Sequence, residues 1–284
     1  MNDSAAASTD PDRLAAKLVD QLHSMGSVAV ALSGGVDSTV VAKAAFLALG
    51  DKAVAATGRS PSLAATELED AQRAAALIGI RHVVMDTSEF SDPNYVRNDG
   101  ARCYFCKSEL YDLLGEWCRR ESVAVLCSGA NLDDLGDYRP GLTAAAERGV
   151  RHPLQEVGFR KAEVRALAAY WDLPCADKPA SPCLSSRIAV GVEATPERVA
   201  RIEQAEAFLR GLGCREFRVR CHHGELARIE ANPEDIARLI SEPARSQVAA
   251  EFRQLGFNYI SVDLEGFRSG SLNVMVPVEL LAKR

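Results

Sequence analysis

The segment Ser33-Gly34-Gly35-Val36-Asp37-Ser38-Thr39 joins two glycines, an acid and three hydroxyls in seven residues. An apolar run precedes it and an Ala-rich segment follows, which places it at the carboxyl edge of a parallel sheet, where ligands bind. Its backbone N–H groups at a helix start suit phosphate, and the glycines let the phosphate approach closely. The loop lacks the lysine of the common ATP-binding loop. We expect Asp37 to hold Mg²⁺, since an acid suits an anion site only through a cation. A plain turn capped by Asp37 is the alternative, which the seven-residue pattern disfavours.

Eight cysteines are the second chemical signal. The chain is long enough for a real core, and its first residues lack the basic start and apolar stretch of an export signal, so metal or thiol chemistry is favoured over disulfides. Cys103 and Cys106 share one helical face, and Cys183 lies in a proline-rich segment. Three such thiolates suit Zn²⁺ with a fourth ligand or a [4Fe–4S] cluster with one open iron. Two buried small residues explain Cys103 and Cys106 equally well by spacing alone. The other five are expected in the core: Cys118, Cys127, Cys175, Cys214 and Cys221.

Three arginines could recognise an anion. Arg187 follows Cys183 by four residues, and its planar fork suits a phosphate or carboxylate. Arg218 and Arg220 are two apart on an expected strand, so they point to one face. Such a pair can bind a substrate phosphate, although an ordinary solvated strand face is nearly as compatible with the spacing.

The first half of the chain alternates apolar runs with helical patterns. This alternation predicts a parallel sheet covered on both faces, a doubly wound α/β domain. The first helix starts at Asp10-Pro11, with proline at the first helical position. The expected strands are 27–32, 52–57, 80–86 and 123–128, and the helices between them are 38–49, 66–78 and 102–120.

The pattern changes near residues 172–191, which contain three prolines. Beyond them, an amphipathic helix, two paired strands, two further helices and a last strand predict a smaller C-terminal α+β domain. The expected division is a disordered tail at 1–11, an ATP-binding domain at 12–175, a proline-rich active loop or linker at 176–191, and a substrate-binding and oligomerisation domain at 192–284.

Composition narrows the class of protein. The 284 residues are 47% hydrophobic and 25% charged, and no apolar run is long enough to span a bilayer. We therefore expect a cytoplasmic protein without a membrane contact. The net charge of −6 argues against nucleic acid as a partner of the whole surface.

The motifs resemble a known family. "SGGVDST" is similar to the PP-loop of ATP pyrophosphatases, which cleave ATP to AMP and pyrophosphate; this resemblance explains the absent lysine, because no γ-phosphoryl group is transferred. "CSGANLDDLGDYRPG" at 127–141 resembles that family's later nucleotide-edge segment and adds Gly129 to the ATP site. Together with "RCYFCKSELY", "KPASPCLSSRI", "RVRCHHGELARIE" and "VDLEGFRSGSLN", the motifs run in the order found in LarE sulfur transferases.

The resemblance implies a reaction. The LarE substrate is a pyridinium mononucleotide with two carboxylates, which serves the nickel-pincer cofactor of lactate racemase. ATP and Mg²⁺ would convert a carboxylate to an acyl-adenylate, which the Cys183 thiolate attacks. In the sacrificial version Cys183 loses its sulfur; in the three-cysteine version Cys103, Cys106 and Cys183 bind a [4Fe–4S] cluster, and the C-x-x-C favours that version here. The substrate-binding residues implied by the family are Tyr104, Arg187, Glu206, Arg218, Arg220 and Glu230, and the family's homo-oligomers imply the same for this chain.

Two other functions remain open from the sequence. A tRNA-thiolating enzyme shares the PP-loop and three cysteines, but it should carry a broad basic surface or a zinc-ribbon module, and neither is visible. A non-catalytic nucleotide or metal-binding module would explain the loop but not the cysteines and arginines together. Release of AMP and pyrophosphate from ATP would distinguish the two enzyme hypotheses from the non-catalytic module.

Overall fold

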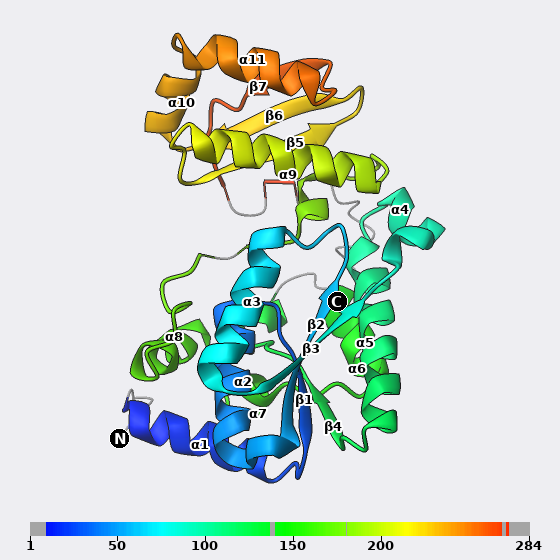
Figure 1. Ribbon diagram of the computed structural model, residues 1–284, viewed down its shortest axis with the longest axis vertical. Coiled ribbons are helices and arrows are strands. Elements are labelled where there is room, and N and C mark those ends of the chain that lie inside the picture. The colour runs from blue at the N-terminus through cyan, green and yellow to red at the C-terminus, as the bar shows by residue number, and fades with distance from the viewer. Residues whose placement is uncertain (1–9, 137–139, 180, 269–270, 273–284) are drawn as a thin grey trace, which may run out of the picture. The chain divides into compact units, whose positions relative to one another are not determined.

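The computed structural model describes residues 10–136, 140–179, 181–268 and 271–272. It divides into two compact units (Figure 1). The first unit comprises Met1–Ser60, Ala65–Thr87 and Cys106–Ser181, and the second comprises Pro61–Ala64, Ser88–Phe105 and Pro182–Arg284. Neither unit is a single stretch of sequence. The expected tail at 1–11 lies outside the described residues except for Asp10, which caps the first helix, and Pro11, which begins it.

The first unit is built on a four-stranded sheet in the order β3-β2-β1-β4, with every pair parallel. This confirms the predicted parallel sheet. The chain runs outward from β1 through β2 and β3 and then returns to the other side of β1, so the strand order reverses between β1 and β4. Ligands of open α/β sheets bind at the carboxyl ends of strands at such a reversal. The strands are β1 Val28–Ala31, β2 Ala53–Arg59, β3 Arg81–Asp86 and β4 Val125–Cys127.

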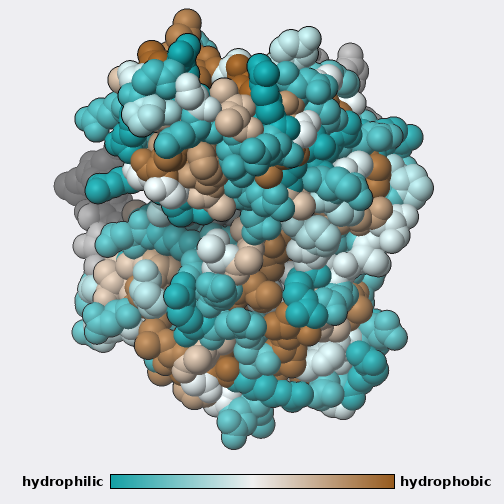
Figure 2. All heavy atoms as spheres, turned by 45° about the horizontal axis from the view of Figure 1, so that its top comes forward, coloured by the Kyte–Doolittle hydropathy of each residue, from teal (hydrophilic) through white to brown (hydrophobic). Residues whose placement is uncertain are grey.

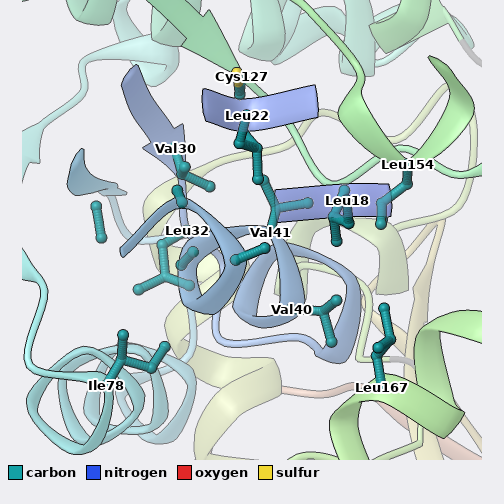
Figure 3. Packing of buried hydrophobic residues seen from close by; sticks show 14 of the residues in the cluster. Leu18, Leu22, Val30, Leu32, Val40, Val41, Ile78, Cys127, Leu154 and Leu167 are labelled. Carbon is teal, nitrogen blue, oxygen red and sulfur yellow. The ribbon is translucent and has the colours of Figure 1, made fainter. Parts of the chain in front are cut away.

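Helices pack on both faces of this sheet, and successive side chains of each strand point to opposite sides, so a strand contributes to two cores. The edge strand β3 is only partly buried. Val28 and Val30 of β1 enter one core, whereas Ala29 enters the other. Figure 3 shows the first core, in which Val30 lies with side chains from α1, α2, α3, α7 and α8. The helices are α1 Pro11–His23, α2 Val36–Leu49, α3 Ala65–Ile78, α7 Pro153–Glu156 and α8 Lys161–Tyr170 on this face, α5 Arg102–Arg120 and α6 Pro140–Glu147 on the other, and the short α4 Pro93–Arg97 in the second unit.

Helix α2 matters most for the site because it starts directly after the glycine loop. It begins at Val36, two residues before the predicted start, with Gly35 in extended conformation as its N-cap and no side chain capping it. It ends at Gly50, as predicted, where φ is 54°. Most of its side chains are buried, which is typical of a helix enclosed by neighbours rather than lying at a surface. The packed core therefore fixes the N-terminus of α2 at the edge of the sheet.

The second unit contains a three-stranded sheet in the order β5-β6-β7. The predicted strand pair is confirmed: β5 is antiparallel to β6, and β7 runs parallel to β6. Thr195 and Asn232 cap the helices that begin at Pro196 and Pro233. The bounds are α9 Pro196–Gly211, β5 Phe217–His222, β6 Leu226–Ala231, α10 Pro233–Leu239, α11 Ala244–Gln254 and β7 Tyr259–Val262.

Figure 2 shows mostly hydrophilic side chains on the visible face, with hydrophobic residues between them in separate patches. Among the helices of the described residues, none has the length and apolar character that crossing a bilayer requires.

Candidate active site

The glycine loop after β1 is held by close packing at Gly34 and by hydrogen bonds to the Gly35 carbonyl. Gly34 adopts φ 75°, and a Cβ at this position would lie 3.0 Å from both Ala71 N and Glu67 O of α3. Gly35 accepts hydrogen bonds at its carbonyl from Ser38 Oγ (3.2 Å) and Thr39 Oγ1 (2.8 Å). The Thr39 side chain is fully buried, so its hydroxyl stabilises the loop from within. Ser33 is exposed, and its Oγ lies 3.1 Å from Ser38 Oγ.

Gly129, which follows β4, lies against the first turn of α2. A Cβ on Gly129 would lie 2.6 Å from Ser38 N and 2.9 Å from Ser38 Cα. Only glycine allows the two backbones to come this close. The neighbouring Asn131 donates from Nδ2 to Asp37 Oδ1 at 3.0 Å. The structure thus brings Gly129 and the glycine loop together at the strand reversal.

Two lysines from distant parts of the sequence reach this loop. Lys161 Nζ lies 2.5 Å from Asp37 Oδ2. Lys178 Nζ donates to the Gly34 carbonyl at 3.3 Å and pairs with Glu67 and Asp70 of α3 at 2.7 Å each. Burial lowers the pKa of Lys178, but its hydrogen bonds to Asp70 and Glu67 outweigh this effect and leave the pKa raised. The loop therefore has no lysine of its own but lies beside two.

Asp37 is the residue of this group that fits Mg²⁺. A carboxylate is the ligand that this cation prefers in proteins, where it takes one or two carboxylates together with substrate phosphates. The Asp37 side chain is 25% exposed at the N-terminus of α2, and its current counter-ion is the Lys161 ammonium. Asp37 would hold the cation, and the backbone N–H groups of the α2 terminus would hold the phosphates.

In the second unit, Cys183 lies on a tightly held turn. We call residues 182–187 the Cys183 turn; Cys183 itself is exposed and precedes the short helix η4, Leu184–Arg187. Leu184 N donates to Ser62 O at 2.8 Å, and Ser185 Oγ lies 2.8 Å from Tyr95 Oη. Leu184 and Ser185 are buried although the adjacent thiol is open to solvent.

Arg187 and Glu206 form a buried ion pair beneath this turn. Arg187 is 4% exposed and Glu206 5%, with Nε donating to Oε1 at 3.1 Å. Neither side chain therefore faces solvent. Glu206 Oε1 also accepts from Val219 N of β5 at 3.1 Å. The pair therefore joins the Cys183 turn, α9 and β5.

Glu230 lies between two arginines. It is 0% exposed and accepts from Arg220 Nη2 at 2.8 Å and from Arg228 Nη2 at 3.0 Å. Arg218 faces Glu230 across the β5–β6 pair, and its guanidinium lies 5.0 Å from the centre of the Phe267 ring. Burial, followed by repulsion from Arg187, lowers the pKa of Arg218. Arg228 also pairs with Asp263 at 3.1 Å, so Glu230 and Asp263 together balance the charges of Arg220 and Arg228.

The cysteines behave as two groups. Cys103 is exposed and Cys106 half-buried on α5, whereas the five cysteines expected in the core are buried. Burial raises the pKa of the Cys127 thiol to about 12 and that of Cys221 to about 11. Within the described ranges, no three His, Cys, Asp or Glu residues form a group that could hold a metal ion. Tyr104 is half-buried, with its ring edge-on to Phe105 at 5.4 Å.

A parallel sheet with a lysine-free glycine loop at its strand reversal defines a PP-loop enzyme of the ATP pyrophosphatase type. A family model described as NAD synthase matches residues 12–98. Over 91% of its length the chain is 36% identical to pyridinium-3,5-bisthiocarboxylic acid mononucleotide synthase of Lactiplantibacillus plantarum, covering 93% of that protein. It therefore belongs to that family of sulfurtransferases, the LarE family.

The chain is similar to other proteins as well. An uncharacterised protein of Synechocystis, slr1717, is 49% identical over 86% of this chain and 91% of its own length. The tRNA-specific 2-thiouridylase MnmA of Azorhizobium caulinodans is 34% identical, but over only 54% of this chain and 49% of its own. The similarity to tRNA-thiolating enzymes thus covers about half of each protein, so that reading is the weaker one.

Three residues that contact the glycine loop were not predicted from the sequence: Asn131, Lys161 and Lys178. Lys161 is the first residue of α8, where a cation is disfavoured by the helix dipole. A lysine at that position is a signal that could have been noticed. For Lys178, the sequence offers only its place within the proline-rich segment.

Proposed function

We propose that this protein uses ATP to convert the carboxylates of pyridinium-3,5-biscarboxylate mononucleotide into thiocarboxylates. AMP and pyrophosphate are the other products. The product is the thiolated precursor of the nickel-pincer nucleotide of lactate racemase-type enzymes. The observation that carries the proposal is the exposed Cys183 thiol on a fully anchored turn, in a chain that matches the synthase over nine-tenths of its length.

The glycine loop and Gly129 bind the nucleotide in this proposal. The N-terminus of α2 holds the phosphates, Ser33, Gly34, Gly35, Val36, Ser38 and Thr39 shape that cradle, and Asp37 holds Mg²⁺. A substrate carboxylate oxygen attacks the α-phosphorus of ATP, pyrophosphate leaves, and an acyl-adenylate forms. The Cys183 thiolate then attacks the acyl carbon and displaces AMP, which leaves a thioester.

Sulfur leaves Cys183 in the sacrificial form of the reaction. A base removes the Cys183 α-proton, a Cα–Cβ double bond forms, and the Cβ–S bond breaks with its electron pair on the departing thiocarboxylate. Cys183 becomes dehydroalanine, so each protein molecule acts once on this route. Intact mass before and after turnover tests it: a loss of H₂S located at residue 183 is expected.

A [4Fe–4S] cluster on Cys103, Cys106 and Cys183 is the catalytic alternative that we retain. When bound, such a cluster supplies an open iron that can carry an extra sulfide. Thiolates are the ligands that it needs, but no three-cysteine group is formed by the described residues, and we derive no step through the cluster. Anaerobic purification with iron and sulfide analysis, joined to an unchanged protein mass after turnover, would support this route.

We assign substrate binding to the second unit. Arg218, which is half-buried, suits the substrate phosphate, and Arg220, held by Glu230, supports it from the same face of β5, with Tyr104 in the same predicted set. Arg187 and Glu206 were predicted in this set too, but the two side chains are buried against each other and against the backbone of the Cys183 turn. Association into a homo-oligomer through the 192–284 region is also proposed, and light scattering tests it.

Either of two results would contradict the proposed function. A Cys183→Ser protein that makes as much thiolated product as the wild type would remove the nucleophile from the scheme. ATP consumed without AMP formation would remove the adenylate. The tRNA-thiolating alternative, favoured only by the partial MnmA similarity, predicts thiolated tRNA from the same assay mixture.

A further inference from the structure

We propose that Arg187, held by Glu206, is a positioning residue that fixes the Cys183 turn for nucleophilic attack and does not bind the substrate's anionic groups. This inference rests on the proposed function, because it assigns a part in the attack by Cys183. It changes the role that the family resemblance suggested for the pair.

The N–H groups of Arg187 point at protein acceptors. A guanidinium has five N–H groups. Nη1 donates to the carbonyl of Pro182 and, at 2.9 Å, to that of Cys183, and it also lies 3.3 Å from Ser186 Oγ. Nε and Nη2 donate to Glu206 at 3.1 and 3.3 Å. Recognition of a ligand phosphate favours two parallel donors on one edge, and here those edges already serve protein acceptors.

The Arg187–Glu206 pair is enclosed and tied to neighbouring backbone. Both side chains are buried, and Glu206 also accepts from Val219 N, which ties it to the backbone of β5. Charges in a buried site interact more strongly than in water and are costly to leave unpaired. The pair is therefore poorly suited to open for each substrate molecule and well suited to serve as a fixed support.

The backbone of the Cys183 turn is hydrogen-bonded, whereas its thiol is exposed. The Cys183 carbonyl accepts from Ser186 N at 2.9 Å and Ser186 Oγ at 2.6 Å as well as from Arg187. Arg220 Nη1 lies 3.3 Å from Ser186 O, a further contact on the same backbone. The Cys183 side chain nevertheless stays exposed. A rigid backbone that presents an open thiol is what a pre-organised nucleophile requires, because small misplacements slow attack strongly.

Two half-reactions separate positioning from substrate binding. Substrate-dependent exchange of labelled pyrophosphate into ATP reports adenylation, which needs bound substrate but not Cys183. Formation of the Cys183 thioester, measured by intact mass after acid quench, needs both. For Arg187→Lys and Glu206→Gln we expect exchange within about twofold of wild type and thioester formation at least about tenfold slower. Arg198→Lys is the matched control, since Arg198 also pairs with a glutamate in this unit, at 2.7 Å from Glu225, and should change neither.

Hydrogen exchange gives a readout that does not depend on activity. Amides in a peptide covering residues 182–188 should exchange several-fold faster in both variants and be unchanged in Arg198→Lys. Equal loss of pyrophosphate exchange and thioester formation in Arg187→Lys, with a raised KM for the pyridinium nucleotide, would make Arg187 a substrate ligand and overturn the inference. Unaltered hydrogen exchange would overturn it too. Thermal melting shows whether each variant folds. If Arg187→Lys does not fold, Glu206→Gln still tests the proposal.

Failure of the proposed function looks different. A wild-type protein without substrate-dependent pyrophosphate exchange would refute the adenylation scheme. The hydrogen-exchange comparison would still show whether Arg187 and Glu206 hold the turn.

Discussion

Asp37 of the glycine loop is paired with Lys161, a lysine that lies far outside the loop in sequence. The acid lies where phosphate is expected, and the ammonium 2.5 Å away offsets its charge before any cation arrives. Lys161 stands at the first position of α8, where the helix dipole opposes it. Its placement is therefore best explained by what it neutralises at the glycine loop.

Replacing Lys161 with Ala should weaken ATP binding. The glycine loop then has one positive charge fewer beside the phosphates of ATP, and we expect a Kd for ATP about tenfold higher, equivalent to ~1.4 kcal/mol. Isothermal titration calorimetry measures it. Arg160→Ala is the control, because the adjacent Arg160 is exposed and pairs with Asp133 instead. Equal Kd values for the two variants would show that the charge at position 161 is irrelevant to the nucleotide.

Gly129→Ala should damage the site through shape alone. The added methyl would lie 2.6 Å from Ser38 N, so the β4 loop must move away from α2, at a cost of about 1–3 kcal/mol in the free energy of unfolding. ATP affinity should fall with it. Gly211→Ala provides the comparison, since a methyl there meets nothing within 4 Å. Chemical denaturation of both variants that gave the same midpoint would contradict the steric argument.

At the scale of elements, the β5–β6 pair carries its own buried charge network. Glu230 is fully buried between Arg220 and Arg228, so Glu230→Ala leaves two guanidiniums without their shared partner. Loss of one member of a buried ion pair typically costs about 3–5 kcal/mol. Urea denaturation followed by circular dichroism should show that loss, whereas Glu234→Ala, at an exposed position of α10, should stay within about 0.5 kcal/mol.

Thiol labelling should show that the cysteines of helix α5 and the Cys183 turn react before those of the strands. Iodoacetamide at pH 8 should modify Cys103 and Cys183 first, because both are exposed. Burial and the raised pKa of the Cys127 and Cys221 thiols should protect those residues until the protein is unfolded in urea. Peptide mass mapping gives the order, and early labelling of Cys127 would show that its strand opens readily.

Helices and strands whose apolar residues recur at a regular spacing were predictable from the sequence. Helix α5 has the expected bounds, and the sheet strands lie within two residues of theirs. Strand β4 is shorter than predicted because Val123 N donates to Cys118 O and so finishes the preceding helix instead of joining the sheet. Such a local competition between helix end and strand start leaves no mark in hydrophobic periodicity.

The site was predictable only where it was local in sequence. The glycine loop could be read directly, but the contact between Lys178 and Gly34 joins residues 144 apart. Glu206 was hardest, because a single glutamate on an amphipathic helix normally faces solvent; here it is buried by an arginine that its own helix does not contain. Pairing across distant segments has no periodic signature.

For the whole molecule, the histidines set the expected response to mild acid. Burial lowers the pKa of His82, His152 and His222 in the folded state. Such residues contribute stability above the unfolded pKa of about 6.5, and that contribution is lost as pH falls toward the folded pKa. Carboxylates with lowered pKa, such as Asp70, lose theirs only below about pH 4. Tm should therefore fall between pH 7.5 and 5.5.

Scanning calorimetry across that range provides the measurement. His152→Asn should flatten the slope, because His152 is half-buried beside Ser128 and its pKa is lowered mainly by burial. A Tm that stays level or rises on acidification would contradict the sign.

The interleaving of the two units also affects how the chain is made. The chain passes between them after Ser60, Ala64, Thr87, Phe105 and Ser181. Tyr95 and Asn98 emerge from the ribosome early, yet their hydrogen-bond partners Ser185 and Val192 follow 90 and 94 residues later. At about 5–20 residues per second, the 88–105 segment waits on the order of 5–20 s before its own unit can close around it. Nascent chains of this protein should therefore depend on chaperones most strongly during that interval.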